Sequence, residues 1–298
     1  MYLRANAKIN LSLDVLRKRD DGYHDVRMIM QMVGMYDRLN LTPVTGLPGI
    51  HLTTNLSYIP VNENNLVVKA AKMLMDEFGV TDGLEIRLDK FIPVAAGLAG
   101  GSSDAAQTFL GVNRLFGLGL TKEELMQRGA RIGADVPYCI LGGTALSEGV
   151  GDILTPLPPM PDACILLCKP NINVSTKEIY TELRAAELAF HPDVDAQIRA
   201  LKEGDLRAMT APGVMYNVLE TVTGIKHPVI NRIETAMTEA GALASIMSGS
   251  GPTVFGIFDD TDKAEACRVM LKKTRPSART FLTWPADTRK GRHHYERK

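Results

Sequence analysis

Apolar and polar side chains alternate from residue 5 to residue 16, and this two-residue period predicts a long strand. One face is apolar and the other polar: Ile9, Leu11, Leu13 and Val15 against Lys8, Asn10, Ser12 and Asp14. Alternation of this kind is typical of a strand that buries one face, so the simplest interpretation of the polar face is exposure to water. A charged turn over 17–24 follows, closed by Gly22, and the Met- and Ile-rich segment 26–33 is predicted to return into the sheet.

Further patterns predict a mixture of strands and helices along the rest of the chain. Strands are expected at 37–41, 51–54, 84–88, 138–146 and 163–168, and a strand–loop–strand unit at 244–258. Helices are expected at 67–78, after the glycines near residue 100, from the capping box at Thr121 to Gly133, from Ser175 to Leu183, and at 229–240 before Gly241. Such a mixture predicts an α+β fold with two layers in each half of the chain.

Prolines mark the expected domain boundary. Residues 155–161 contain four prolines in seven positions, which favours a linker, because proline fits poorly inside a sheet or a helix. We therefore expect an N-terminal domain over 1–157 and a C-terminal domain over 158–298. From about residue 287 the sequence is basic without apolar period, which predicts a disordered tail.

Charge and cysteine content narrow the function classes. The 298 residues include 34 Lys plus Arg and 34 Asp plus Glu, so no bulk charge favours nucleic acid or a membrane surface as a partner. No apolar h-region and no run of about 18 apolar residues occurs, which predicts a cytoplasmic protein. The four cysteines lack the C-x-x-C spacing of zinc sites, so we expect reduced, buried thiols and no residue acting as a metal ligand.

The stretch P-V-A-A-G-L-A-G-G-S-S-D-A-A over 93–106 is the strongest candidate for chemistry. It leads from a predicted strand through Gly97, Gly100 and Gly101 into a helix that Ser102, Ser103 or Asp104 could cap. A helix start of this kind presents free N–H groups and partial positive charge, which suits a phosphate, although a purely structural turn is the alternative. The sequence contains no Walker A loop, G-x-G-x-x-G fingerprint, protein-kinase signature or G-x-S-x-G elbow, so a nucleotide site here belongs to another design.

Three further features each have a structural alternative. Asp135 lies in an Ala-Asp-Val-Pro turn, where its carboxylate could simply bond its own backbone. Tyr23 and His24 leave the charged turn and could be incidental. The Ser/Gly loop over 248–251 could be only a hairpin turn.

Three separated stretches together resemble the GHMP small-molecule kinases. They are A-N-A-K-I-N-L-S-L-D-V-L-R-K-R-D-D-G-Y-H from Ala5, P-V-A-A-G-L-A-G-G-S-S-D-A-A from Pro93, and S-G-S-G-P-T-V-F-G from Ser248. Their order and spacing match over nearly the whole chain, and A-D-V-P around Asp135 and N-L-V-V-K-A-A from Asn65 add to the match. The Lys-Ile-Asn and Asp-Gly-Tyr-His elements resemble the members that act on a cytidyl methylerythritol, rather than homoserine, mevalonate or galactose kinases.

The resemblance implies two domains, each a layered mixed sheet with helices, and a cleft between them in which ATP, with Mg²⁺, phosphorylates the 2-hydroxyl of the methylerythritol unit for isoprenoid precursors. It implies Asp135 as the base and Lys8 as the cation that favours the ionised carboxylate and offsets charge on the phosphoryl group. It implies ATP contacts at Asn65, Lys90, Pro93, Ala95, Gly97, Leu98, Ala99, Gly100, Gly101, Ser102 and Ser103, with Ser102 or Ser103 near Mg²⁺. It implies substrate contacts at Asn10, Tyr23, His24, Asp135 and Thr176, with Tyr23 stacked on cytosine and residues 248–251 backing the cleft.

Two rival functions make different predictions. An RNA-binding protein using the basic tail would need neither Lys8 nor Asp135 and would bind RNA in a salt-sensitive way. Another GHMP kinase would take a different alcohol, and Tyr23 and His24 argue against that. The expected partners are therefore small molecules, with no nucleic acid and no membrane, and the expected assembly is a monomer or a weak homodimer.

Overall fold

Two long strands, β1 (Tyr2–Lys18) and β2 (His24–Val44), begin the fold and pair with each other. The predicted strand at 5–16 is confirmed, as is the turn before β2, which Arg19 N closes by donating to Tyr23 O at 2.8 Å. Two expectations are wrong. Residues 37–41 are the second half of β2 rather than a separate strand, and the polar face of β1 is buried: Lys8, Asn10, Ser12 and Asp14 are at most 5% exposed.

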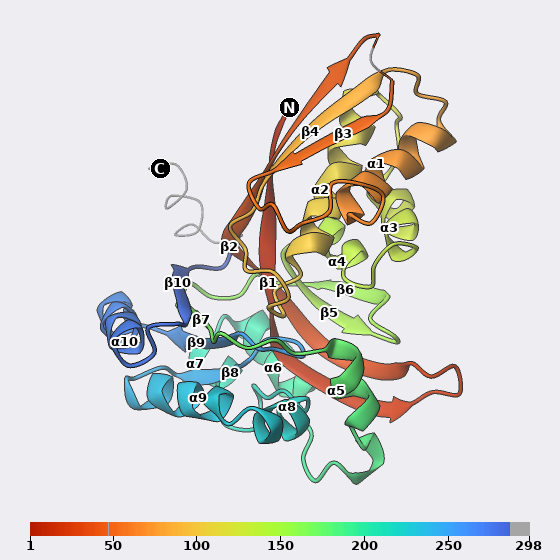
Figure 1. Ribbon diagram of the computed structural model, residues 1–298. Helices are drawn as coiled ribbons and strands as arrows, with labels where there is room; N and C mark the ends of the chain where they lie inside the picture. Colours follow the sequence, from red (N-terminus) through yellow and green to blue (C-terminus); the bar gives the residue numbers. More distant parts are fainter. Residues whose placement is uncertain (47, 287–298) are drawn as a thin grey trace. The chain divides into compact units, whose positions relative to one another are not determined.

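The computed structural model describes residues 1–46 and 48–286, which form two units (Figure 1). Unit 1 comprises residues 1–7, 35–94 and 99–142, and unit 2 comprises 8–34, 95–98 and the described residues from 143 onward. Neither unit is contiguous in sequence, because β1 and β2 contribute residues to both. The domain division after residue 157 stays a prediction, and the tail expected from about residue 287 lies outside the described residues.

Unit 1 is a small sheet with helices on it. The second half of β2 pairs antiparallel with β4 (Gly83–Asp89), and β3 (Ile50–Thr54) pairs parallel with β4. The helices are α1 (Leu66–Glu77), α2 (Gly100–Leu115), α3 (Lys122–Ala130) and α4 (Val136–Leu141). Figure 1 shows α1 and α2 on one side of β3 and β4, and Leu74 and Phe109 from these two helices are fully buried.

Most helix predictions in unit 1 are confirmed, and two local ones are wrong. Thr121 forms the predicted capping box with Glu124 at the start of α3. Residues 138–141, expected as a strand, instead belong to α4, and the strand begins only at Thr144, after two glycines with positive φ. Helix α2 already begins at Gly100, so Ser102, Ser103 and Asp104 lie inside its first turns rather than capping it.

Unit 2 contains the rest of the strands. The first half of β2 pairs with β5 (Thr144–Glu148), and β5 pairs with β6 (Ile153–Leu157). Pro156 lies within β6 opposite Ala145, so the expectation that the whole proline-rich segment stays outside a sheet is wrong. Because β6 is the last strand in the order, it is an edge, which is where a strand tolerates proline.

A second sheet in unit 2 has the order β10-β7-β9-β8, with every neighbouring pair antiparallel. Its strands are β7 (Cys164–Lys169), β8 (Ala244–Met247), β9 (Val254–Phe258) and β10 (Arg279–Thr283). The α-helices of this unit are α5 (Thr176–Glu182), α6 (Val194–Glu203), α7 (Leu206–Met209), α8 (Glu220–Lys226), α9 (Val229–Glu239) and α10 (Thr261–Thr274). The predicted strands at 163–168 and 244–258 and the helix before Gly241 are confirmed.

Apolar burial is complete along the centre of the second sheet, where Leu166, Phe255 and Phe258 are 0% exposed. All four cysteines are free and buried, as predicted. Burial raises the pKa of Cys168 to about 12, which makes the thiol inert. Within residues 1–46 and 48–286, no helix is both long enough and apolar enough to cross a membrane.

Candidate active site

The glycine-rich loop turns sharply into α2 through residues with positive φ. Ala95, Gly97 and Ala99 have φ values of 50°, 75° and 53°, and for the two alanines this left-handed conformation is strained. The first intrahelical bond of α2 is donated by Ser103 N to Ala99 O at 2.9 Å. The N–H groups of Gly100, Gly101 and Ser102 precede that bond, so the start of α2 offers donors to an anion.

The three glycines of this loop have different surroundings. A Cβ on Gly97 would overlap the carbonyl oxygen of Ser248, and a Cβ on Gly100 would lie 3.2 Å from Lys90 Nζ and 3.0 Å from Ile92 Cγ2. A Cβ on Gly101 would meet nothing closer than Leu66 Cδ1 at 3.9 Å. Close protein packing therefore requires the first two glycines, whereas Gly101 leaves space that a ligand could use.

A buried charge cluster lies beside this helix start. Lys90 Nζ donates to Asp37 and to Asp104 Oδ2, the latter at 2.6 Å, and all three side chains are at most 4% exposed. Asp37 Oδ1 also accepts from the backbone N–H groups of Phe91 and Ile92 at 2.5 and 2.8 Å. The ammonium group of Lys90 is thus held by two carboxylates, and a contact between Lys90 and the ATP nucleoside stays a prediction.

The pKa values of Asp104 and Lys90 in this cluster are both raised above their ordinary values. Burial raises the pKa of Asp104 to about 8, against the opposing effect of Lys90. Burial also opposes the charge on Lys90, but the two carboxylates outweigh it and raise the pKa of that amine. Asp104 Oδ1 and the neighbouring Ser103 Oγ are buried and have no hydrogen-bond partner among the described residues. The sequence interpretation missed Asp37, for which no local signal exists, and took Asp104 only as a helix cap.

Asn65 and Asp135 occupy the starts of two other helices in unit 1. Asn65 caps α1: its Oδ1 accepts from Val67 N at 3.0 Å and its Nδ2 donates to Pro60 O at 2.8 Å. Asp135 is the N-cap residue of α4, yet in the described structure its side chain makes no capping hydrogen bond. Pro137, two residues on, has no N–H to donate, so an Asx bond to that position is excluded, and the role of Asp135 stays a prediction.

The starts of α1, α2 and α4 lie close together within unit 1. A Cβ on Gly133, two residues before Asp135, would lie 3.7 Å from Ser102 Oγ and 4.0 Å from Leu66 Cδ1. Unit 1 therefore gathers Asp135, the capping region of Asn65 and the N–H groups of α2 in one neighbourhood. Lys8 belongs to unit 2, so its pairing with Asp135 stays a prediction.

In unit 2, Lys8 and Asn10 sit side by side on β1. Lys8 Nζ donates to Asn10 Oδ1 at 2.8 Å, and Asn10 Nδ2 contacts Met28 Sδ at 3.2 Å. The backbone N–H of Lys8 donates to Leu98 O at 3.1 Å, which ties the strand to the glycine-rich loop. The two polar side chains are therefore positioned by the sheet rather than extended into solvent.

The loop Ser248–Gly251 joins the other candidate residues of unit 2. Ser248 Oγ donates to Gly97 O at 2.9 Å, and the hydroxyls of Ser250 and Thr176 are 2.7 Å apart. A Cβ on Gly249 would lie 3.5 Å from both Lys8 Nζ and Asn10 Oδ1. The loop thus does more than reverse the chain: it brings Gly97, Thr176 and the Lys8–Asn10 pair together.

Tyr23 and His24 differ in environment although they are adjacent. The side chain of Tyr23 is 66% exposed, whereas His24 is buried and its ring centroid lies 5.3 Å from that of Tyr180 on α5. Burial, with a smaller effect of Lys18, lowers the pKa of His24, so its imidazole is neutral at pH 7. The sequence interpretation missed Tyr180, which lies one helical turn after Thr176 and so shares its face of α5.

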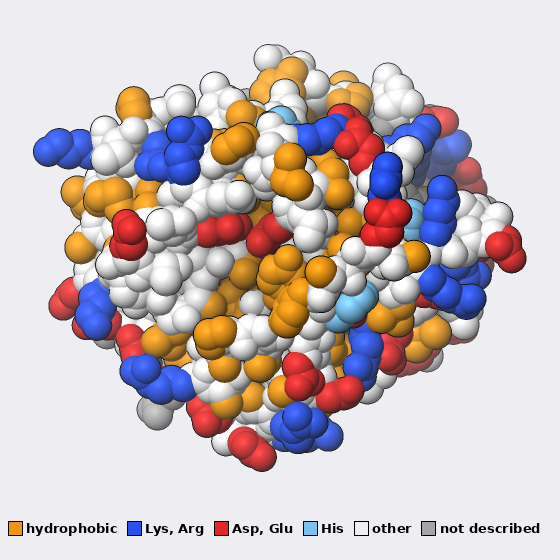
Figure 2. Space-filling view, turned by 90° about the horizontal axis from the view of Figure 1, so that it is seen from below, with side chains coloured by type: hydrophobic (Ala, Val, Ile, Leu, Met, Phe, Trp, Pro, Cys, Tyr) orange, Lys and Arg blue, Asp and Glu red, His pale blue; other side chains and the backbone are white. Residues whose placement is uncertain are grey.

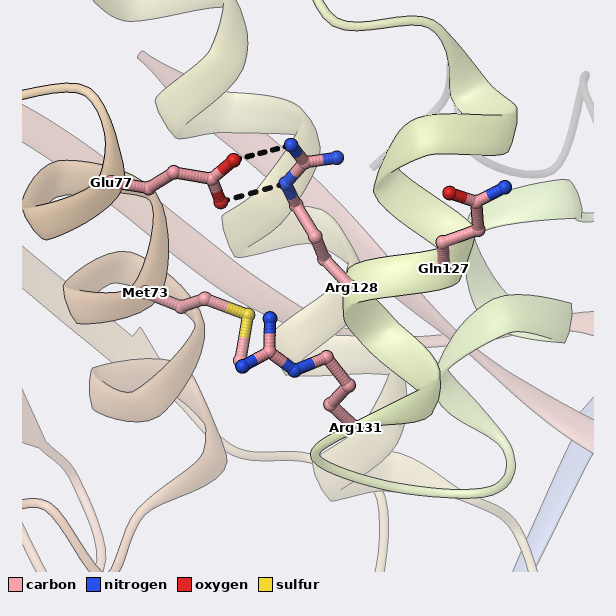
Figure 3. Close-up of a pocket in the computed structure, with 5 residues that line it drawn as sticks. All are labelled: Met73, Glu77, Gln127, Arg128 and Arg131. Carbon is pink, nitrogen blue, oxygen red and sulfur yellow. Dashed lines mark hydrogen bonds and ion pairs between the residues drawn. The ribbon is translucent and has the colours of Figure 1, made fainter.

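A pocket between α1 and α3 is lined by none of the predicted site residues. Figure 3 shows its lining, Met73, Glu77, Gln127, Arg128 and Arg131. Arg128 forms a bidentate ion pair with Glu77, with nitrogen–oxygen distances of 2.9 and 2.5 Å. The predicted residues of each unit, rather than this pocket, are the candidate active-site residues.

The face of the molecule in Figure 2 carries side chains of both charges. Figure 2 shows Lys and Arg side chains scattered among Asp and Glu on the face in view, and no continuous basic stripe among its described residues. Proteins that bind nucleic acid through the backbone gather positive charge on one surface.

Two family models and several named proteins match this chain. The GHMP kinases N terminal domain matches residues 65–143, and the GHMP kinases C terminal domain matches residues 197–276. Proteins from Lachnoclostridium phytofermentans and Lachnospira eligens, both named 4-diphosphocytidyl-2-C-methyl-D-erythritol kinase, are each 50% identical over 94% of this chain and 96% of their own.

Solved structures agree on the architecture. A crystal structure of 4-(cytidine 5'-diphospho)-2C-methyl-D-erythritol kinase superposes with a TM-score of 0.81 and 32% identity, covering 95% of this chain and 98% of the other. Homoserine kinase from Cytophaga hutchinsonii superposes with a TM-score of 0.71 over 93% and 94% of the two chains, but at 18% identity it shows only the shared fold. The predicted two-domain α+β fold is confirmed, and the chain belongs to the GHMP kinase family, among the 4-diphosphocytidyl-2-C-methyl-D-erythritol kinases.

Proposed function

We propose that the protein transfers the γ-phosphoryl group of ATP to the 2-hydroxyl of 4-diphosphocytidyl-2-C-methyl-D-erythritol. The observation that carries this proposal is the loop Ser248–Gly251, which brings Lys8, Asn10, Thr176 and Gly97 together in a chain that belongs to this kinase family. Phosphoryl transfer depends mainly on positioning and on stabilising negative charge, and these residues supply polar groups suited to both.

The start of α2 suits the phosphates of ATP. Its N–H groups at Gly100, Gly101 and Ser102 and the partnerless hydroxyl of Ser103 are donors for phosphate oxygens, and Gly101 leaves room beside them. Mg²⁺ bound with ATP would neutralise phosphate charge. Ser102 or Ser103 would lie near the cation. In the described part of the chain there is no group of three or more His, Cys, Asp or Glu that could hold a metal.

Asp135 and Lys8 carry the proposed chemistry. Asp135, whose turn lies beside the start of α2, would accept the proton of the attacking hydroxyl. Lys8, already oriented by Asn10, would offset the negative charge that develops on the transferred phosphoryl group.

The cytidyl end of the substrate would lie at Tyr23, His24 and Thr176. An exposed tyrosine ring can stack on a base, and a neutral imidazole or its backbone can hydrogen-bond the base edge. Homoserine and mevalonate carry no base, so this pair favours the cytidyl substrate over theirs. We expect the enzyme to act in the cytoplasm on small molecules, as a monomer or a weak homodimer.

An ATP-consumption assay over four acceptors tests the proposal. Purified protein with Mg²⁺-ATP should turn over the cytidyl methylerythritol and not homoserine, mevalonate or galactose, and phosphorus NMR of the product should place the new phosphate on the 2-hydroxyl. Turnover of another acceptor alone would reassign the protein within the family. Salt-sensitive RNA binding without any turnover would favour the RNA-binding alternative.

A further inference from the structure

Side chains just before and within α8 form hydrogen bonds to the backbone in and next to the loop Ser248–Gly251. Asn217, which is 0% exposed, donates from Nδ2 to both Met247 O and Gly249 O at 2.8 Å. Thr223 Oγ1 adds a longer bond to Ser250 O at 3.4 Å. Side chains therefore hold three backbone carbonyls in and next to the loop, those of Met247, Gly249 and Ser250.

Glu220 fixes the entrance to the loop. Its Oε1 accepts from Met247 N at 2.6 Å, at the last residue of β8. Burial, then the neighbouring Glu234 on α9, raises the pKa of Glu220 well above its ordinary value, and a side-chain hydrogen bond with Glu234 adds to this effect. Burial raises the pKa of Glu234 to about 7, and Glu234 Oε1 is enclosed without a partner among the described residues. The pair therefore keeps at least one proton at neutral pH.

Tyr216 also lies close enough to this pair to feel its charge. Tyr216, in the segment before α8, is raised in pKa by burial and by both glutamates, so it stays neutral. From α5, Glu178 and Glu182 bind Lys226 at the opposite end of α8, where their charges offset one another. The net charge next to the loop therefore depends mainly on whether the two glutamates keep the proton that they share.

We propose that Asn217, Glu220 and Glu234 are positioning residues that hold the loop Ser248–Gly251 in its binding shape, and that the proton shared by the two glutamates is required for this. The inference rests on the proposed function, because the loop orders Thr176, Gly97 and the Lys8–Asn10 pair. With one proton, Glu220 both accepts from Met247 and donates to Glu234. Loss of that proton leaves two adjacent negative charges that repel each other, so the loop loosens as the pH rises.

Three variants separate positioning from general structure. Glu220→Gln keeps an acceptor for Met247 N and a donor to Glu234 but cannot ionise, so kcat/KM at pH 7 should stay within about 3-fold and its alkaline decline should move upward or vanish. Glu220→Ala removes both bonds, so KM for both substrates should rise about 5-fold to 50-fold at pH 7. The matched control is Glu239→Gln, at an exposed position of α9, the helix that carries Glu234. Its kcat/KM should depend on pH as that of the wild type does.

Amide hydrogen exchange of the peptide covering 245–253 gives a readout independent of turnover. At pH 9, wild type should exchange faster than Glu220→Gln, whereas at pH 6.5 the two should match. Equal exchange at both pH values, or an unchanged alkaline limb of kcat/KM in Glu220→Gln, would overturn the inference even if Glu220→Ala does not fold. If the wild type phosphorylates no acceptor, the proposed function fails, and the exchange experiment still decides whether the glutamates hold the loop.

Discussion

At the residue scale, Asp135 carries the catalytic hypothesis, because it is a carboxyl at the start of α4, close to the start of α2. If it accepts the substrate proton, Asp135→Asn should lower kcat about 100-fold to 10,000-fold, the usual loss for a general base, while substrate affinity stays within a few-fold. Steady-state kinetics with both substrates measures this, and an unchanged thermal midpoint is the control. Turnover close to wild type would exclude Asp135 as the base.

Lys8, also at the residue scale, is a charged side chain that the fold buries. Two-residue alternation identifies which side chains share a face of β1 but not what covers that face, and Lys8 is only 5% exposed. A buried amine is costly unless it is hydrogen-bonded, and Asn10 Oδ1 at 2.8 Å meets that need. The Lys-x-Asn spacing therefore has a structural reason: residues i and i+2 of a strand lie on one face.

At the element scale, the start of α2 combines strain with buried charge. Two alanines in the left-handed region turn the chain, and the Asp37–Lys90–Asp104 cluster holds β2, the segment after β4 and α2 together. Buried ion pairs stabilise little in net terms, but removing one partner leaves an uncompensated charge. The cluster thus fixes where the helix begins and which N–H groups it presents.

Gly100 and Gly101 should respond differently to the same substitution. Gly101→Ala adds a methyl where the nearest protein atom is 3.9 Å away, so the protein should fold normally but bind ATP about 10-fold or more weakly if phosphate occupies that space. Gly100→Ala is the contrast, because its methyl would press on Lys90 and Ile92 and should lower the thermal midpoint. Calorimetric titration with ATP, with circular dichroism for stability, measures both.

Unchanged ATP affinity in a folded Gly101→Ala protein would return this glycine to a purely structural role. A fall in stability for Gly101→Ala equal to that of Gly100→Ala would contradict the packing difference between them. The cytidyl substrate should bind both folded variants normally.

At the scale of the whole molecule, the candidate residues divide between the two units. Most predicted ATP contacts, from Asn65 to Ser103, belong to unit 1. Of the predicted substrate contacts, Asp135 belongs to unit 1, and unit 2 contains Asn10, Tyr23, His24 and Thr176. Substitutions at Tyr23 or His24 of unit 2, the residues predicted to contact cytosine, should therefore change the affinity for the cytidyl substrate with little effect on ATP.

Tyr23→Ala tests this division. Loss of base stacking costs about 1 to 3 kcal/mol, so affinity for the cytidyl substrate should fall about 5-fold to 150-fold while ATP affinity stays within 2-fold. Tyr2→Ala, a similarly exposed tyrosine in unit 1, is the control and should leave cytidyl affinity unchanged. Equal losses for both substrates in Tyr23→Ala, measured by titration calorimetry, would mean that Tyr23 supports the fold instead.

Local chemistry along the sequence was enough to predict the elements whose signals lie within a few residues. Alternation predicted β1, the Thr121–Glu124 capping box predicted α3, and Gly241 marked the end of α9, because backbone period and capping bonds are short-range. The motifs around Lys8, Gly97 and Ser248 were also sufficient to indicate the family and hence the two-domain fold.

Only the tertiary structure decided which distant residues meet. Asp37 and Lys90 are 53 positions apart, and Asn217 reaches a loop 30 residues away, so no local pattern could pair them. Burial of the polar face of β1, the helical state of residues 138–141 and the edge position of Pro156 likewise depend on neighbours that other parts of the chain supply. Residue type and spacing thus determined the candidate chemistry, whereas long-range packing determined its protonation, its burial and the side chains that hold it in place.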